Sequence, residues 1–448
     1  MIDGSQPLAC VIDTPLWSRA PGVNEVLHRG REAVHSNGDG PKPNFDFYEF
    51  FAGGGMARAG LGSRWRCLFA NDFDNKKAVT YSENWRDDVL KTKDVRDVTP
   101  DELPGSPDLV WASFPCQDLS LAGMGAGLRG DRSGTFWPFW NLITTLAAER
   151  RGPRLLVLEN VCGTLTSHGG KDFGAIANAL ATAGYRFGAV VMDAANFVPQ
   201  SRPRLFIVGA TDSVAVGAGY SFDSPSEHWH PRALRAAFER LSPELQRQWI
   251  WWRLPTPPTR TINLIDIIEE EPQDVAWHRP EETKRLLSMM SGVNLAKVEA
   301  AQRTGRFLVG TVYKRTRRDE RGLKIQRAEI RFDGLAGCLR TSAGGSSRQV
   351  IVIVTGNQVR SRLTSSRETA RLMGLPDTYK LPKNYNEAYH LTGDGVVVPV
   401  VRFLTTNLLE RLLQPAPTPG RSYDDRCALP AERESQEPRQ RVRRGLED

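Results

Sequence analysis

Short runs of hydrophobic residues recur along the first half of the chain, and glycine, proline or polar turn residues bound them. Segments with the spacing of an amphipathic helix lie between most of these runs, for example at 78–85, 137–149 and 172–183. This alternation predicts an α/β domain with a mostly parallel sheet. The expected strands are 45–51, 65–70, 108–112, 154–158, 185–192 and 205–209.

The alternation fades in the middle of the chain and returns near the C-terminus. The middle is also the most basic part, because residues 301–330 contain nine Lys or Arg and three Asp or Glu. Helical spacing at 366–375 and an apolar run at 395–411 resume the earlier pattern. The last segment is rich in charge and proline and poor in apolar residues, as disordered tails are. We predict an N-terminal extension over 1–44, the main α/β domain over 45–211, a smaller irregular domain over 212–360, the rest of the main domain over 361–414 and a disordered tail over 415–448.

Composition limits the class of protein. The 448 residues are 40% hydrophobic and 25% charged, which is ordinary for a globular chain with a buried core. Apolar runs are of strand length only, and the first ten residues lack the basic and apolar segments of a secretory leader. Six scattered cysteines without a CxxC pair disfavour a zinc ribbon and a disulfide framework. We expect a cytoplasmic protein without a membrane partner or a metal site, and the net charge of +7 permits a polyanionic partner.

A glycine-rich turn follows the first expected strand, in Phe51-Ala52-Gly53-Gly54-Gly55. Glycines between a strand and a helix let a ligand approach the free N–H groups of the helix, although a tight turn without a ligand uses them too. Asp72 ends the second run, where a doubly wound fold places an acceptor for ribose hydroxyls or where an acid simply caps the next helix. With Phe73 beside it and Asp94 further along, the series fits a nucleoside ligand.

A second group of polar residues follows the later strands. Cys116 comes after the strand at 108–112, where α/β enzymes place reactive groups, although a free cysteine is more often a small buried hydrophobe. Glu159 ends the next expected strand. Arg202 and Arg204 precede another strand, and their alternative interpretation is a solvated turn. The glycines after Cys116 predict a loop, 117–136, that closes over a substrate.

The ordered motifs FAGGG, NDFD, DV, SFPCQ, ENV, QSRPRLFIVG, RETARLMGLPDTY and GDGVVVPV closely resemble those of the cytosine-specific, carbon-5 DNA methyltransferases. The resemblance covers about 45–209 and 367–413, and it breaks over the middle segment, where that family varies its target-recognition domain. It implies the Rossmann-like fold of methyltransferases that use S-adenosyl-L-methionine, with a smaller irregular target-recognition domain. It also implies methyl transfer to carbon 5 of a flipped-out cytosine in a specific duplex DNA sequence, with S-adenosyl-L-homocysteine as the product and no metal.

The resemblance also implies roles for individual residues. Cys116 is expected to add to carbon 6 of cytosine, Glu159 to contact the ring nitrogen, Arg204 to hold the ring carbonyl and Arg202 to order the site. The last motif reads Gly393-Asp394-Gly395 where the family usually has Gly-Asn-Ser, so Asp394 adds a negative charge near the cofactor. Glu49 stands where an aspartate is common. The expected cofactor-binding residues are Phe51, Ala52, Gly53, Gly55, Asp72, Phe73, Asp94, Pro115 and Asp394.

DNA contacts are expected in three places. Gln117, Ser120 and Arg132 belong to the segment that closes on the flipped base. Lys314, Arg315, Arg317 and Arg318 are candidates for phosphate contacts, although a solvated charged face explains them as well. The stretch 339–348, with Arg340, Thr341 and Arg348, is the candidate for base-edge contacts or for filling the space of the flipped base. Trp249, Trp251 and Trp252 are expected in the core.

Two other functions stay open on the sequence alone. One is a cytosine-5 methyltransferase for structured RNA such as tRNA, whose relatives tend to have Pro-Pro-Cys where this chain has Phe114-Pro115-Cys116. The other is a DNA-binding regulator that has lost turnover, although the cysteine, the glutamate and both arginines are present. We expect a monomer associated with the nucleoid that marks host DNA, alongside a cognate nuclease or phage-defence proteins.

Overall fold

The computed structural model describes residues 44–86, 88–115, 133–318, 321–340 and 348–414. Almost all of the expected N-terminal extension and C-terminal tail therefore lies outside the described residues. One sheet of seven strands dominates the described part, in the order β3-β2-β1-β4-β5-β7-β6. Its strands are β1 (Phe45–Phe50), β2 (Trp65–Asp72), β3 (Leu90–Thr92), β4 (Leu109–Ala112), β5 (Leu155–Val161), β6 (Tyr185–Asp193) and β7 (Pro203–Thr211).

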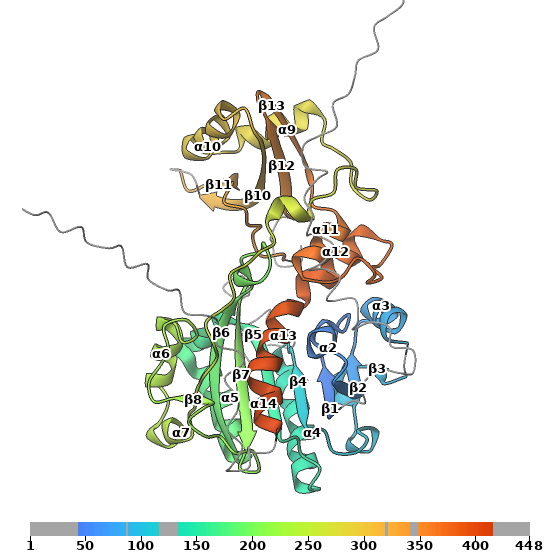
Figure 1. Ribbon diagram of the computed structural model, residues 1–448, viewed down its shortest axis with the longest axis vertical. Coiled ribbons are helices and arrows are strands. Elements are labelled where there is room, and N and C mark those ends of the chain that lie inside the picture. The colour runs from blue at the N-terminus through green and yellow to red at the C-terminus, as the bar shows by residue number, and fades with distance from the viewer. Residues whose placement is uncertain (1–43, 87, 116–132, 319–320, 341–347, 415–448) are drawn as a thin grey trace, which may run out of the picture. The chain divides into compact units, whose positions relative to one another are not determined.

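Neighbouring strands from β3 to β5 pair in parallel, and β7 pairs antiparallel with both β5 and β6. The prediction of an α/β fold with a mostly parallel sheet is confirmed. Helices connect the strands and return the chain to the sheet (Figure 1). The α-helices of the described residues are α2 (Met56–Leu61), α3 (Asn75–Trp85), α4 (Phe136–Ala148), α5 (Lys171–Thr182), α6 (Arg232–Glu239), α7 (Pro243–Arg247), α8 (Leu264–Ile267), α9 (Pro280–Ser288), α10 (Gly292–Arg303), α11 (Ser366–Leu372), α12 (Tyr385–Asp394), α13 (Val398–Leu404) and α14 (Glu410–Leu413).

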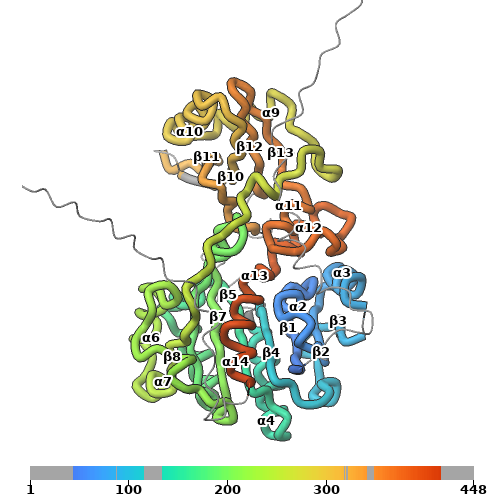
Figure 2. Tube along the Cα trace, viewed as in Figure 1, coloured from blue at the N-terminus to red at the C-terminus, as the bar shows by residue number. Residues whose placement is uncertain are grey.

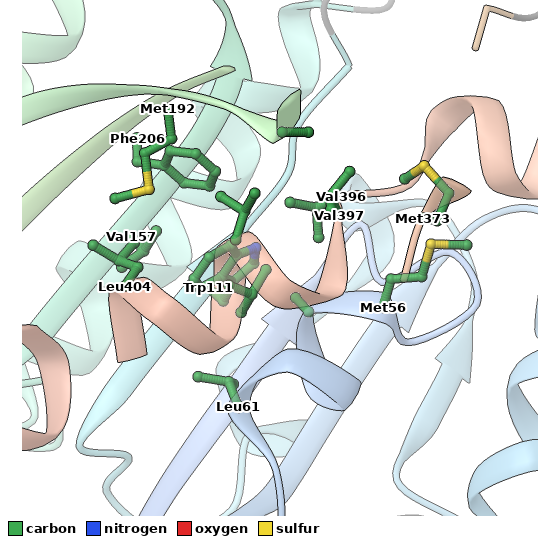
Figure 3. Packing of buried hydrophobic residues seen from close by; sticks show 14 of the residues in the cluster. Met56, Leu61, Trp111, Val157, Met192, Phe206, Met373, Val396, Val397 and Leu404 are labelled. Atoms are coloured by element: carbon green, nitrogen blue, oxygen red, sulfur yellow. The ribbon is translucent and has the colours of Figure 1, made fainter. Parts of the chain in front are cut away.

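The central strands are buried on both faces, which explains their continuous apolar runs. Successive residues of β4 alternate between two core clusters, with Leu109 and Trp111 in one and Val110 and Ala112 in the other. The first cluster also contains the residues at the start of α13 and along it. Figure 3 shows this packing, with side chains of the sheet facing those of the C-terminal segment and α2: Met56, Leu61, Trp111, Val157, Met192, Phe206, Met373, Val396, Val397 and Leu404.

The C-terminal segment packs against the first part of the described chain. α13 packs against α2, which is about 340 residues earlier in the chain (Figure 2). Arg402 Nη1 donates to the Leu61 carbonyl at 2.7 Å, and Trp65 Nε1 donates to Glu410 Oε1 at 3.1 Å. The first and last parts of the described chain therefore share one core.

The middle segment contains more regular structure than the sequence indicated. Four antiparallel strands form a second sheet in the order β11-β10-β12-β13, and α9 and α10 contribute to its core. These strands are β10 (Phe307–Arg318), β11 (Lys324–Arg331), β12 (Val350–Thr355) and β13 (Gln358–Leu363), and a separate pair is formed by β8 (Ser221–Phe222) and β9 (Trp251–Trp252).

The segment around β8 and β9 packs on the seven-stranded sheet. The Phe187 amide of β6 donates to Gln248, and the Ile250 amide donates back to Phe187 at 2.7 Å. Trp249 and Trp252 are buried, as expected of core residues. The boundaries drawn at 211/212 and 360/361 stay predictions.

Candidate active site

The glycine-rich turn connects β1 to α2 and exposes backbone to a cleft. Phe51 has a φ of 58° and Gly55 a φ of 77°, so the chain turns sharply at both positions. A Cβ on Gly55 would lie 2.1 Å from Trp85 Nε1, which is why this position requires glycine. The Gly54 carbonyl accepts hydrogen bonds from Tyr379 Oη at 2.7 Å and Trp85 Nε1 at 3.3 Å. Trp85 from the first part of the chain and Tyr379 from the last part therefore both hold the turn.

Asp72 lies at the end of β2 beside this turn. Its Oδ2 accepts from the Gly53 amide at 2.8 Å, and its Oδ1 accepts from the Asp74 amide at 2.9 Å. Burial raises the pKa of Asp72, while the Lys77 ammonium and these two amides oppose the rise. A carboxylate has about four acceptor positions, so Asp72 can still accept ligand hydroxyls.

Two further predicted residues line the same region. The Phe73 ring is 67% exposed at the cleft, which suits a residue that stacks on a flat ligand. Asp94 accepts hydrogen bonds from Arg96 Nε at 3.0 Å and Arg96 Nη2 at 2.9 Å. This hydrogen bonding to Arg96 lowers the pKa of Asp94, so the carboxylate is ionised and oriented.

The second group of polar residues opens onto the same cleft. Glu159 is buried near the end of β5, and its Oε1 lies 3.2 Å from Arg204 Nε at the start of β7. Asn160 Nδ2 donates to the Phe114 carbonyl at 3.3 Å and so fixes the chain just before Pro115. Cys116, Gln117, Ser120, Arg132 and Thr341 lie outside the described residues.

Arg202 is buried between three segments. Its Nη2 donates to the carbonyls of Gly393 at 2.8 Å and Gly395 at 2.7 Å. Its Nη1 donates to the Leu339 carbonyl at 2.9 Å and lies 3.3 Å from Cys338 Sγ. Burial lowers the pKa of Arg202, and the nearby Arg204 lowers it further. Arg202 thus joins the start of β7 to the 338–339 segment and to the last motif.

A single cleft of about 580 Å³ brings the two predicted groups together. The glycine turn, Asp72 and Phe73 form one part of the lining, and Glu159 and Arg204 form another. Its lining also includes Pro115, Asp94, Arg202 and Asp394, so all the described residues that the sequence assigned to catalysis and cofactor binding contribute, apart from Gly55. The lining residues include Glu49, Phe51, Ala52, Gly53, Asp72, Phe73, Asp74, Lys77, Asp94, Arg96, Pro115, Glu159, Asn160, Arg202, Arg204, His390 and Asp394.

Several residues of this cleft have no predicted role. Lys77 Nζ lies 2.8 Å from Asp394 Oδ2 and so compensates the extra negative charge that Asp394 brings to the last motif. Glu49 Oε1 accepts from the Arg58 amide at 3.3 Å, at the start of α2, while no described residue donates to its Oε2. The sequence could have indicated Arg96, because it lies two residues from Asp94. It could not have indicated Lys77, because its partner, Asp394, is 317 residues away in the chain.

The described residues among those predicted to contact DNA are not part of the cleft lining. Lys314, Arg315 and Arg318 are on β10, where Arg315 pairs with Glu329 at 3.2 Å and Arg318 Nη1 donates to the Gly322 carbonyl. Arg317 is on the same strand. Arg340 is exposed, and Arg348 contacts Asn386 and lies over the Tyr385 ring at 5.4 Å.

The described ranges contain neither a candidate metal site nor a candidate membrane span. No group of three or more His, Cys, Asp or Glu side chains in them is arranged to hold a metal ion. None of their helices combines the length and the apolar character needed to cross a bilayer.

Similarity to known proteins extends over most of the chain. The family described as C-5 cytosine-specific DNA methylase matches residues 45–410. The chain is 26% identical over 391 residues to Type II methyltransferase M.HpaII of Haemophilus parainfluenzae, which covers 83% of this chain and 91% of that protein. It is 25% identical over 369 residues to Type II methyltransferase M.BsuFI of Bacillus subtilis, which covers 82% and 73%.

Solved structures with a similar fold include the methyltransferase EhMeth of Entamoeba histolytica. Its TM-score is 0.54 at 14% identity, over 83% of this chain and 99% of that one. A Dnmt2 variant from Spodoptera frugiperda has a TM-score of 0.53 at 16% identity, over 83% and 100%. At these identities the likeness is evidence of the fold alone.

Proposed function

The chain belongs to the C-5 cytosine-specific DNA methylase family, and from this premise we propose that it transfers a methyl group from S-adenosyl-L-methionine to carbon 5 of a flipped-out cytosine in a specific duplex DNA sequence. The family makes it a DNA (cytosine-5) methyltransferase. The choice of cofactor, the roles of individual residues and the covalent route through Cys116 belong to the proposal.

The cleft lining suits this cofactor. S-adenosyl-L-methionine supplies an electrophilic methyl group on a positively charged sulfur and also carries an ammonium group. Glu49 Oε2 is buried, lines the cleft and has no donor among the described residues, so the ammonium group of the ligand would satisfy it. Binding of this cation would favour the ionised form of Glu49, whose pKa is raised by burial. Asp72 would accept the ribose hydroxyls and Phe73 would stack on adenine. Asp94, oriented by Arg96, would accept the adenine amine.

The polar residues opposite suit a cytosine ring. Carbon 5 of cytosine is a weak nucleophile, and addition of the Cys116 thiolate to carbon 6 makes the ring enamine-like. Glu159 would contact the ring nitrogen and share a proton as negative charge develops there. Arg204, held 3.2 Å from Glu159, would bind the ring carbonyl. Loss of the carbon-5 proton and elimination of Cys116 then restore the ring double bond and the free thiol.

Basic residues on β10 would hold the DNA. Lys314, Arg315 and Arg318 form part of a positively charged strand, which suits phosphate contacts that position a duplex without reading its sequence. Arg340 and Arg348 border the stretch 341–347 and are the described candidates for base contacts. Extrusion of the target base costs a few kcal/mol, which these contacts would offset.

One observation carries the proposal: the glycine turn, Asp72 and Asp94 line the same cleft as Glu159 and Arg204, so a nucleoside-type site and a proton-transfer pair share a single space. Such a space is what a two-substrate transfer requires, because the donor and acceptor atoms must meet without water between them.

The test is methyl transfer by the full chain. Plasmid DNA recovered from cells that express it should show protected cytosines in one sequence context after bisulfite sequencing. Purified protein should transfer labelled methyl groups to duplex DNA and not to tRNA. Cys116→Ser should abolish transfer, and Glu159→Gln should lower it by about 10²–10⁴-fold.

The other outcomes discriminate the alternatives. Labelling of tRNA alone would identify an RNA methyltransferase. DNA binding without transfer by the unaltered protein would identify a regulator. Transfer by Cys116→Ser at the full rate would refute the covalent route.

We also propose a biological role in marking host DNA. The relatives named above are Type II methyltransferases, and a host-marking enzyme acts as a monomer alongside a nuclease of the same specificity. Survival of cells that carry a cognate nuclease only when this protein is expressed would support that role.

A further inference from the structure

An ion pair crosses one edge of the cofactor cleft. Lys77 lies in the first turn of α3, and Asp394 is the last residue of α12. Their Nζ and Oδ2 atoms are 2.8 Å apart, and both residues line the cleft. The Lys77 side chain is only 18% exposed and that of Asp394 is 42% exposed, so solvent screens the pair incompletely.

Lys77 lies among several carboxylates. Asp394, Asp72 and Asp74 all attract its ammonium, and together they raise the pKa of Lys77 although burial opposes the charged form. The same ammonium counteracts the effect of burial on Asp72. Lys77 therefore interacts electrostatically both with the proposed ribose acceptor and with the extra carboxylate of the last motif.

The turn that contains Asp394 is held from two sides. Lys77 binds the Asp394 side chain, and Arg202 binds the carbonyls of the flanking Gly393 and Gly395. Loss of Lys77 would leave the Asp394 carboxylate without this partner at the cleft wall. The turn would then have only the Arg202 contacts to fix it.

We propose that Lys77 is a positioning residue for the cofactor, because its pairing with Asp394 fixes the 393–395 turn and offsets the charge that Asp394 brings into the cleft. The inference rests on the proposed function, since it takes the cleft to bind S-adenosyl-L-methionine. It predicts that loss of either partner weakens cofactor binding and that loss of both weakens it no further.

A second ion pair between the same helices provides a matched control. Lys76 Nζ lies 2.8 Å from Glu387 Oε1, and its side chain is 68% exposed. Neither residue lines the cofactor cleft; both line a neighbouring cavity of about 230 Å³. The variant Lys76→Met/Glu387→Gln removes an ion pair between α3 and α12 without changing the charge of the cleft.

The experiment is calorimetric titration of the full chain with S-adenosyl-L-homocysteine and with S-adenosyl-L-methionine. Lys77→Met and Asp394→Asn should each raise the Kd for S-adenosyl-L-homocysteine on the order of tenfold. The double variant Lys77→Met/Asp394→Asn should bind no more weakly than either single variant, because each single change already breaks the pair. The Lys76→Met/Glu387→Gln control should bind as the unaltered protein does.

The two ligands provide a further readout, because only S-adenosyl-L-methionine carries the sulfonium charge. Lys77→Met leaves an additional negative charge and should weaken S-adenosyl-L-homocysteine more than S-adenosyl-L-methionine. Asp394→Asn should have the opposite preference. A merely structural contact would weaken both ligands alike.

Three results would overturn the inference: single variants that bind normally, a double variant as weak as the singles combined, or a control that loses as much affinity. Thermal unfolding of each variant is measured in parallel, and Lys77→Gln replaces Lys77→Met if the latter does not fold. If the unaltered protein binds neither ligand, the proposed function fails as well. If it binds both and the variants behave as it does, only the role of Lys77 is refuted.

Discussion

At the scale of single residues, Glu49 is a buried carboxylate with a pH-dependent effect on stability. Burial raises the pKa of Glu49 to about 8, although Arg58 lowers it through charge and through its amide. Its ordinary value is 4.5. Between these two values the folded chain keeps the proton that the unfolded chain has lost. Stability therefore falls as the pH rises from about 4.5 to about 8, and this contribution is constant above that range.

We expect Glu49→Gln to remove this dependence. The amide keeps an oxygen for the Arg58 amide and has no charge to bury. Between pH 5 and pH 8, the free energy of unfolding of the variant should rise relative to that of the unaltered protein by about 2–4 kcal/mol. Urea unfolding at several pH values measures this. Parallel pH profiles for the two proteins would show that Glu49 is ionised throughout the range.

Which site residues could be predicted depends on the distance to their partners along the chain. Asp72 and Glu159 are found at the carboxyl ends of strands, where the pattern of apolar runs already put them. Lys77 could not be found in this way, because it pairs with Asp394, which is 317 residues later in the chain. No local pattern encodes such pairs.

At the scale of elements, the packing of β6 against the 248–252 segment depends on a small residue. A Cβ on Gly188 would lie 1.8 Å from the Ile250 carbonyl oxygen. The same segment exchanges backbone hydrogen bonds with Phe187. Close approach of the two backbones therefore requires glycine at this position.

We expect Gly188→Ala to lower the free energy of unfolding by about 1–3 kcal/mol, because the backbone must shift. Gly174→Ala in α5 is the matched control, since a Cβ there meets no atom within 4 Å. It should raise stability by about 0.5–1 kcal/mol, because alanine favours a helix. Chemical denaturation measures both, and a Gly188→Ala variant as stable as the control would contradict this packing.

The elements that the sequence did not predict have weak patterns. β10 carries basic residues on both faces beyond Val312, so it lacks the alternation of a half-buried strand. α12 has a sequence of low overall hydrophobicity, and it packs against α3 and α11. By contrast, the central strands of the main sheet are buried on both faces, and their apolar runs predict them directly. The short edge strand β3, Leu-Lys-Thr, is largely exposed and was not predicted.

At the scale of the whole molecule, Arg202 connects three distant segments. Three carbonyls, those of Leu339, Gly393 and Gly395, take hydrogen bonds from its buried guanidinium. We expect Arg202→Met to cost at least about 3 kcal/mol, because these acceptors lose their donor. Arg186→Met, at an exposed position on β6, should change stability by no more than about 0.5 kcal/mol. Equal thermal unfolding of the two variants would contradict the bridging role of Arg202.

Because the C-terminal segment completes the first core, the cleft forms only late in the synthesis of the chain. Residues 390–396 form one wall of the cleft, and α13 covers α2. While a ribosome is still translating the middle of the message, the glycine turn has already been made but has no opposite wall. A nascent or prematurely terminated polypeptide that ends before residue 390 therefore lacks the complete pocket, and competence arises only once residues 390–404 have been translated.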